Sequence, residues 1–446
     1  MKAALCVLVA CASPRAPRPV VLQACHVPGV AEALQCGTLG VPEDRAHPDG
    51  RRLQLPIVVL PGPHGHGRPR FFLDGGPGIA ATMQAPLFAG DLRALRATGD
   101  IVLVDARGTG DGPSALACPE LDEGRGLMTG VAAVRACRDR LAARADLRFY
   151  GTLDVARDLD AARAALGYDR IDLEALSYGT RVAQAYLKLY PSRVRAAVLF
   201  GALAMDVHLP ADFAPEAQRG LDQLVDDCAQ DAPCAAAFPE LRAQLVQVAP
   251  ARLPAGVDRG AFSEDIRHAL AIPATARAVP LAIARAAAGD LTRAPAAGVH
   301  AREAVLLAVT CSEDIPAIDR ERELARSGQT WFGDHRLRAQ LAACDAWPRS
   351  PYPRAMFEPV ASGAPVLVFV GGRDSITPPA YARRAVQRMP HAQLVELPWS
   401  GHLPIGLAHL ECLDQIELAF LAHPEAPVDA SCVAAMAPPP FATRAP

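Results

Sequence analysis

A serine between small residues lies where a strand-like run meets a helical pattern. The run Arg170–Glu174 breaks at Ala175-Leu176-Ser177-Tyr178-Gly179, and an amphipathic helical pattern begins at once. This is the pattern of a nucleophile elbow, in which small residues let the backbone pass close to a serine on a sharp turn. The first N–H groups of the following helix would face negative charge near that serine. A serine that merely caps a helix fits the pattern too.

A glycine-rich loop follows a strand-like run upstream of this serine. The apolar run Phe71–Asp74 leads into Gly75-Gly76-Pro77-Gly78. Such a loop can bring the backbone N–H of Gly76 near the elbow, where it would join the N–H of Tyr178 in an oxyanion hole. Glycine and proline also dominate ordinary turns.

Two further polar residues follow strands downstream. The continuous apolar run Ala364–Val370 leads to Asp374, and the run Gln393–Leu397 leads to Ser400-Gly401-His402. The chain order Ser, Asp, His, with both partners on loops after strands, is the order of the α/β-hydrolase fold. We therefore predict Ser177 as the nucleophile, His402 as its general base and Asp374 as the acid that orients the imidazole. An aspartate that caps a turn is the alternative for Asp374.

Together these motifs resemble the prolyl-iminopeptidase and tripeptidyl-aminopeptidase (TAP-like) branch of the α/β hydrolases, from about Cys36 to His402. The chain departs from that pattern at Asp74, where histidine is usual, and at Ala175, where glycine is usual. The resemblance implies a serine peptidase without metal or cofactor. It also implies that Asp105 and Arg107, which end another core strand, form a structural ion pair.

An acidic pair is the candidate for substrate recognition. An exopeptidase needs a carboxylate that meets the free α-ammonium of its substrate. The segment Cys311-Ser312-Glu313-Asp314 follows the apolar run Ala304–Val309 and resembles a recurrent element of the TAP-like group. The resemblance implies Glu313 as the ammonium contact, with Asp314 second. A solvated acidic pair at a helix end explains the segment equally well.

Strand and helix patterns divide the chain into four parts. Residues 1–24 form a leader and linker, 25–205 the first part of the hydrolase core, 206–355 a helical lid, and 356–446 the second part of the core. In both core parts strands alternate with helices, which predicts a mainly parallel sheet with helices on both faces.

The chain has 12 cysteines, and ten of them lie beyond residue 20. Without a Cys-x-x-Cys motif, zinc is disfavoured, and an even number of scattered cysteines in a large enzyme fits disulfides formed in an oxidising compartment. Buried free thiols are the alternative. Proximity in sequence suggests five pairs, although sequence alone leaves the connectivity open: Cys25–Cys36, Cys118–Cys137, Cys228–Cys234, Cys311–Cys344 and Cys412–Cys432.

The N-terminus has features of an export signal. Lys2 precedes a short apolar run that ends in small residues. The segment Leu8-Val9-Ala10-Cys11 resembles a lipoprotein box with Cys11 as the lipid carrier, while Ala10-x-Ala12 also allows ordinary cleavage. We expect a periplasmic, lipid-anchored or secreted protein. The net charge of −3 provides no basic field, so nucleic acid is not expected as a partner.

The sequence thus predicts an exported serine hydrolase, an aminopeptidase that releases a residue or short peptide from peptide N-termini through an acyl-enzyme. A carboxylesterase with the same triad, acting on small esters, is the first alternative. A non-catalytic binding module of the same fold is the second. The oligomeric state stays open.

Overall fold

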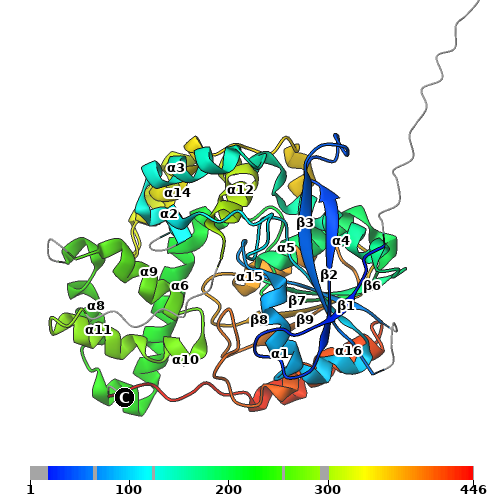
Figure 1. Ribbon diagram of the computed structural model, residues 1–446. Coiled ribbons are helices and arrows are strands. Elements are labelled where there is room, and N and C mark those ends of the chain that lie inside the picture. The colour runs from blue at the N-terminus through cyan, green and yellow to red at the C-terminus, as the bar shows by residue number, and fades with distance from the viewer. Residues whose placement is uncertain (1–18, 64–67, 123–125, 254–256, 292–300, 445–446) are drawn as a thin grey trace, which may run out of the picture.

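A single mixed β-sheet organises the protein. The computed structural model describes residues 19–63, 68–122, 126–253, 257–291 and 301–444. In these residues nine strands form one sheet in the order β1-β2-β3-β5-β4-β6-β7-β8-β9 (Figure 1). Pairing is antiparallel from β1 to β5 along this order and parallel from β5 to β9. The strands are β1 Gln23–Cys25, β2 Leu34–Pro42, β3 Arg52–Leu60, β4 Arg70–Leu73, β5 Ile101–Val104, β6 Ile171–Leu176, β7 Val194–Phe200, β8 Val366–Gly371 and β9 Ala392–Leu397.

The central strands are buried because helices cover both faces of the sheet. Strands β4, β5 and β8 are buried along their whole length, as apolar runs in parallel sheets are. Helices α4 (Thr152–Ala165) and α5 (Tyr178–Leu189) pack on one face. Helices α1 (Ala85–Ala89) and α16 (Glu411–Ala422) bury side chains on the other. The predicted α/β fold with a mainly parallel sheet is confirmed.

The segment between β7 and β8, which we call the helical insertion, contains helices in the region predicted as a lid. Its hydrophobic contacts divide it into two parts. Helices α6 to α11 build a core of their own around residues such as Leu221 and Ile283, and Phe441 from the C-terminal tail joins it. Helices α12 and α14 instead bury Leu307 and Leu341 in the main core. The helices are α6 Leu209–Gln230, α7 Ala232–Ala237, α8 Leu241–Gln247, α9 Arg259–Ala269, α10 Pro273–Ala276, α11 Val279–Ala287, α12 Glu303–Glu313, α13 Arg320–Gly328 and α14 His335–Ala346.

A second group of helices, between β5 and β6, packs on the helical insertion. It contains α2 (Pro119–Asp122) and α3 (Val131–Ala142). Figure 1 shows α2 and α3 beside α12 and α14. The side chains of Val134 and Leu141 on α3 lie in the same core as those of α14. The strand and helix patterns of the sequence did not predict this layer.

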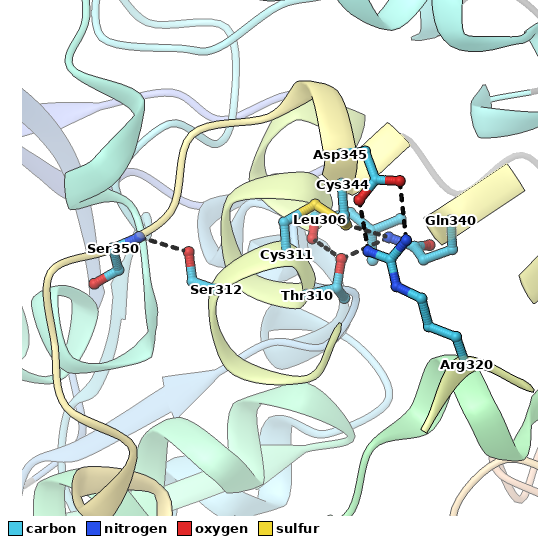
Figure 2. Close-up of a disulfide and its surroundings, with 9 residues drawn as sticks. All are labelled: Leu306, Thr310, Cys311, Ser312, Arg320, Gln340, Cys344, Asp345 and Ser350. Atoms are coloured by element: carbon cyan, nitrogen blue, oxygen red, sulfur yellow. Dashed lines mark hydrogen bonds and ion pairs between the residues drawn. A yellow bond between two sulfur atoms is a disulfide. The ribbon is translucent and has the colours of Figure 1, made fainter. Parts of the chain in front are cut away.

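The ten described cysteines form the five expected disulfides, with Cα–Cα separations of 4.9 to 5.8 Å. Figure 2 shows Cys311–Cys344, which joins α12 to α14 beside the hydrogen bond from Gln340 to Thr310. The proposed lipid carrier Cys11 and the rest of the leader up to residue 18 lie outside the described residues. Within the described residues, no helix is both long and apolar enough to cross a membrane.

The Cys311–Cys344 disulfide offers a test of stability. Replacing both residues by alanine should lower the free energy of unfolding by about 3–4 kcal/mol, because a disulfide that closes a loop of 33 positions restricts the unfolded chain. Urea unfolding of the two proteins in oxidising buffer measures the difference. The same measurement in a reducing buffer is the control, where the difference should vanish. Equal stability in oxidising buffer, or ready thiol titration of the native wild type, would contradict the disulfide.

Candidate active site

Ser177 lies on a strained turn between β6 and α5. Its backbone has φ 55° and ψ −123°, which is unfavourable for any residue other than glycine. The Ser177 N–H donates a hydrogen bond to the Phe200 carbonyl at the end of β7 (2.9 Å). A Cβ on Gly179 would lie 2.1 Å from the Leu73 carbonyl oxygen, so only glycine lets α5 approach β4 this closely. The sequence pattern around Ser177 therefore has a steric cause.

The glycine-rich loop after β4 runs beside the Ser177 hydroxyl. An ideal Cβ on Gly75 would lie 3.5 Å from Ser177 Oγ. The next residue, Gly76, is exposed and has a positive φ of 104°. Tyr178 is the first residue of α5, and its N–H therefore has no acceptor within that helix. Both predicted oxyanion donors thus belong to segments that adjoin Ser177.

Hydrogen bonds hold the two ends of this loop. Asp74, where the related family usually has histidine, accepts hydrogen bonds from the Gly75 N–H and from Gln84 Nε2, both at 2.6 Å. At the other end the Arg302 N–H, just before α12, donates to the Gly78 carbonyl (3.0 Å). Burial raises the pKa of Asp74, although these two donors oppose the shift. The loop is therefore held both by its own strand end and by the helical insertion.

Asp374 and His402 form a hydrogen-bonded pair on the loops after β8 and β9. His402 Nδ1 lies 2.9 Å from Asp374 Oδ2. The Asp374 carboxylate is fully buried and accepts hydrogen bonds from the N–H groups of Ile376 and Thr377 and from the Thr377 hydroxyl, each at 2.8 Å. Burial raises the pKa of Asp374, but His402 and these donors outweigh it, and the pKa lies below its usual value. An ionised Asp374 favours the tautomer with its proton on Nδ1, which leaves Nε2 as a base.

A short segment after β7 separates Ser177 from the pair. Phe200 accepts the hydrogen bond from the Ser177 N–H, and the next residue, Gly201, packs against the His402 ring. A Cβ on Gly201 would lie 3.0 Å from His402 Cε1. The three predicted triad residues thus follow the carboxyl ends of parallel strands, the edge where such sheets carry their sites.

A family model described as alpha/beta hydrolase fold matches residues 71–407 of the chain. The chain belongs to the α/β-hydrolase family. This match spans all three predicted triad residues and the helical insertion between them.

Similarity to individual proteins is more limited in extent. The hydrolase is 31% identical over 254 residues to Serine protease Hip1 of Mycobacterium tuberculosis. This alignment covers 50% of this chain and 48% of that protein. It is also 29% identical over 193 residues to Tripeptidyl aminopeptidase of Streptomyces coelicolor. That alignment covers 37% of this chain and 34% of that protein. The hydrolase therefore matches about half or less of these relatives' length. A solved proline iminopeptidase-related protein from Thermus thermophilus is 20% identical with a TM-score of 0.41, covering 82% of this chain and 90% of that one.

Glu313 and Asp314, the residues expected to meet a substrate ammonium, are engaged inside the hydrolase. Their side chains are 2% and 3% exposed. The Thr152 N–H and hydroxyl donate to the two Glu313 oxygens at 2.7 and 2.6 Å. Arg181 donates to Asp314 Oδ1 at 3.0 Å. A direct ammonium contact would require these carboxylates to leave their present partners.

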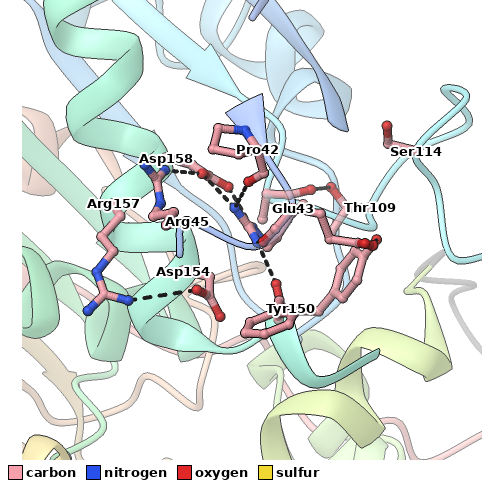
Figure 3. Close-up of polar contacts among 12 residues, drawn as sticks. Pro42, Glu43, Arg45, Thr109, Ser114, Tyr150, Asp154, Arg157 and Asp158 are labelled. Carbon is pink, nitrogen blue, oxygen red and sulfur yellow. Dashed lines mark hydrogen bonds and ion pairs between the residues drawn. The ribbon is translucent and has the colours of Figure 1, made fainter. Parts of the chain in front are cut away.

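Arg107 does not pair with Asp105, so the expected structural ion pair is wrong. Arg107 is fully buried and makes a bidentate ion pair with Asp158 of α4 (2.7 and 2.8 Å). Figure 3 shows Asp158 also meeting Arg45. Asp105 accepts hydrogen bonds from the N–H and the hydroxyl of Thr82 instead. The side chains at the end of β5 therefore have different partners, although they are only two residues apart.

Helix α6 of the insertion holds the loop that carries Asp374, a contact that sequence analysis missed. Asp227 makes a bidentate ion pair with Arg373 (2.8 and 2.9 Å), the residue just before Asp374. Arg219 donates to the Asp374 carbonyl. The Arg373 guanidinium also lies 5.1 Å from the Trp399 ring centroid, on the loop that leads to His402. No local signal reveals these contacts, because each joins segments far apart in the sequence.

Cys118, Glu120 and Cys137 form a cluster of metal-ligand side chains among the described residues. Its two sulfur atoms are joined in a disulfide, so they are not available as the thiolates that bind metals. The cluster therefore does not fit a metal site.

Because His402 packs on Gly201, adding a methyl group at position 201 should reduce activity. Gly201→Ala should lower kcat about tenfold or more, because the new Cβ would lie 2.8 Å from Thr377 Oγ1 and 3.0 Å from His402 Cε1 and would displace the imidazole and the hydroxyl that binds Asp374. Gly167→Ala is the matched control, since Gly167 also has a positive φ but has nothing within 4 Å of its Cβ position. Both variants should lose about 1–2 kcal/mol of stability through backbone strain. Equal activity of the two variants would show that the contact does not position His402.

Proposed function

We propose that this protein is an exported serine hydrolase that acts as an aminopeptidase, releasing a residue or short peptide from peptide N-termini. The observation that carries the proposal is the Asp374–His402 pair, which lies at the same sheet edge as the strained Ser177 turn. A serine hydroxyl is a weak nucleophile, and it needs a neutral imidazole oriented in this way to accept its proton.

The reaction follows from the roles of these groups. His402 takes the Ser177 proton as Oγ attacks the scissile carbonyl, and Asp374 stabilises the imidazolium. The N–H groups of Gly76 and Tyr178 stabilise the negative oxygen of the tetrahedral intermediate. His402 then protonates the leaving amine, which leaves an acyl-enzyme on Ser177. Water, activated by the same imidazole, hydrolyses the acyl-enzyme and restores the hydroxyl.

The peptidase assignment and the cellular location have separate support. Relatives of this chain include proteins named as a serine protease and as a tripeptidyl aminopeptidase. Export is supported by the five disulfides, because such bonds persist mainly in oxidising compartments. The proposal covers a periplasmic protein, a protein anchored through a lipid on Cys11 and a secreted protein, because the leader allows both lipidation and ordinary cleavage.

A carboxylesterase is the second candidate. The observation that favours it is the burial of Glu313 and Asp314, because a small ester has no ammonium and needs no exposed carboxylate. A non-catalytic binding module has less support, since such proteins typically lose the serine or the histidine and this chain keeps Ser177, His402 and Asp374.

The first test of the proposed chemistry is Ser177→Ala. Turnover of any substrate should fall by about 10⁴-fold or more, because no other group replaces the nucleophile. Labelling by a fluorophosphonate probe should disappear, while thermal unfolding shows an intact fold. Ser431→Ala, in the exposed part of the C-terminal region, is the control and should keep both activities. A fully active Ser177→Ala variant would mean that another residue is the nucleophile.

The second test compares substrates of the wild type. A tripeptidyl p-nitroanilide with a free N-terminus should have a kcat/KM about tenfold to a hundredfold above that of its N-acetylated form, since acetylation removes a charge-assisted hydrogen bond of about 1.5–3 kcal/mol. A p-nitrophenyl ester of a short fatty acid measures the esterase activity in parallel. Equal cleavage of the free and acetylated peptides would reject the aminopeptidase, and a strong preference for the ester would favour the esterase.

A further inference from the structure

A chain of buried polar groups leads from the residue after the nucleophile to Glu313. The Tyr178 hydroxyl lies 3.0 Å from Thr152 Oγ1. Thr152, the first residue of α4, in turn donates from its hydroxyl and its N–H to the two carboxylate oxygens of Glu313 (2.6 and 2.7 Å). The three residues are the first residue of α5, the first residue of α4 and the last residue of α12, so the chain of hydrogen bonds joins three helices.

Three further charged or titratable side chains lie near Glu313 or its neighbour: Arg181, Asp314 and His208. Arg181 Nη1 lies 3.8 Å from Glu313 Oε2 and 3.0 Å from Asp314 Oδ1, so one guanidinium serves two carboxylates. On the outer side, His208 Nδ1 lies 3.4 Å from the same Asp314 oxygen. An ideal Cβ on Gly151 would lie 3.0 Å from Glu313 Oε1. Glu313 is therefore enclosed by protein groups, and its hydrogen bonds point toward the elbow.

The direction of the hydrogen bonds depends on the charge of Glu313. An ionised carboxylate accepts from both Thr152 donors, which leaves Thr152 Oγ1 to accept from the Tyr178 hydroxyl. A protonated Glu313 carries a donor of its own, which competes with the Thr152 hydroxyl. Burial raises the pKa of Glu313 to about 7, although Arg181 and the Thr152 hydrogen bonds oppose the shift.

We propose that Glu313 is a positioning residue for the nucleophile elbow, which it holds through Thr152 and the Tyr178 side chain. Tyr178 follows Ser177 directly and supplies an N–H of the oxyanion hole, so a shift of its side chain moves both groups. The inference rests on the proposed role of Ser177 as nucleophile. A positioning role makes Glu313 important for the turnover of every substrate, whereas an ammonium contact would affect only substrates with a free N-terminus.

Two variants break the chain at different links. Glu313→Gln replaces one acceptor oxygen with a donor, and Thr152→Val removes the bridging hydroxyl. Each variant should lower kcat about 10- to 100-fold on both a free tripeptidyl p-nitroanilide and a p-nitrophenyl ester. KM should change little, because the variants misplace the nucleophile and the oxyanion hole and leave the substrate-binding groups in place. Fluorophosphonate labelling of Ser177 should slow by the same factor. Thr152→Ser keeps the hydroxyl and should restore most of the activity.

Thr310→Val is the matched control. Thr310 is buried on α12, one turn before Glu313, and accepts a hydrogen bond from Gln340 (Figure 2). Its loss should lower the unfolding temperature without lowering kcat. If Thr310→Val lowers kcat as much as Glu313→Gln does, the effect is general loss of packing and the inference fails.

The pH dependence gives a signature that a structural role would not produce. Glutamine resembles the protonated form of Glu313. Because the ionised form is present above a pH of about 7, the ratio of wild-type kcat to Glu313→Gln kcat should be large at pH 8 to 9 and approach one below pH 6. A ratio that does not change with pH would contradict the proposal.

The remaining outcomes separate this inference from the proposed function. A loss confined to free-amine peptides would make Glu313 the ammonium contact and overturn the positioning role. Wild-type activity of Glu313→Gln and Thr152→Val on all substrates would overturn it as well. Poor discrimination between free and acetylated peptides by the wild type would reject the aminopeptidase alone, because the ester and labelling measurements involve no ammonium.

Discussion

The strained backbone of Ser177 is the constraint on which the candidate site depends. A φ of 55° in a residue with a side chain persists only where the surrounding structure enforces it. Here β6 pairs with β4 on one side and β7 on the other, and the Ser177 N–H is bound to the Phe200 carbonyl. Gly75 and Gly201 follow the ends of these two neighbouring strands, β4 and β7. A Cβ on Gly75 would lie close to the Ser177 hydroxyl, and one on Gly201 close to the His402 ring. The strands that hold the turn therefore also position the loops on both sides of it.

The inserted helices are part of this arrangement and do more than cover it. The residue before α12, Arg302, binds the glycine-rich loop through its N–H, and the last residue of α12, Glu313, binds Thr152. Helix α6 meanwhile contacts the Asp374 loop through Asp227 and Arg219. The two parts of the helical insertion therefore support different halves of the candidate triad. This division agrees with their separate hydrophobic cores.

The features that sequence analysis predicted correctly are local ones. The Ser177 turn, the Asp374 and His402 loops and the individual strands each come from one short segment of the sequence, and the disulfides join cysteines 6 to 33 positions apart. What it missed are the partners of side chains that contact segments far away in the sequence. Arg107 pairs with Asp158, 51 positions away, because α4 packs beside the end of β5. Glu313 ends a helix in the sequence as an exposed acid would, but α4 and α5 cover it. Such burial depends on tertiary packing and leaves no periodic signal in the segment itself.

Asp74 shows how one departure from a family pattern changes the electrostatics of a site. The related family usually has histidine at this position, whereas here a carboxylate lies at the base of the glycine-rich loop, near the carboxylate of Asp105. Burial raises the pKa of both, to about 6 for Asp105, and each carboxylate disfavours the charge of the other. The groups that oppose these pKa shifts are neutral hydrogen-bond donors. Gly75 and Gln84 donate to Asp74, and Thr82 donates to Asp105. A dipole stabilises a charge without cancelling it, so ionisation of this pair makes the surroundings of the loop more negative.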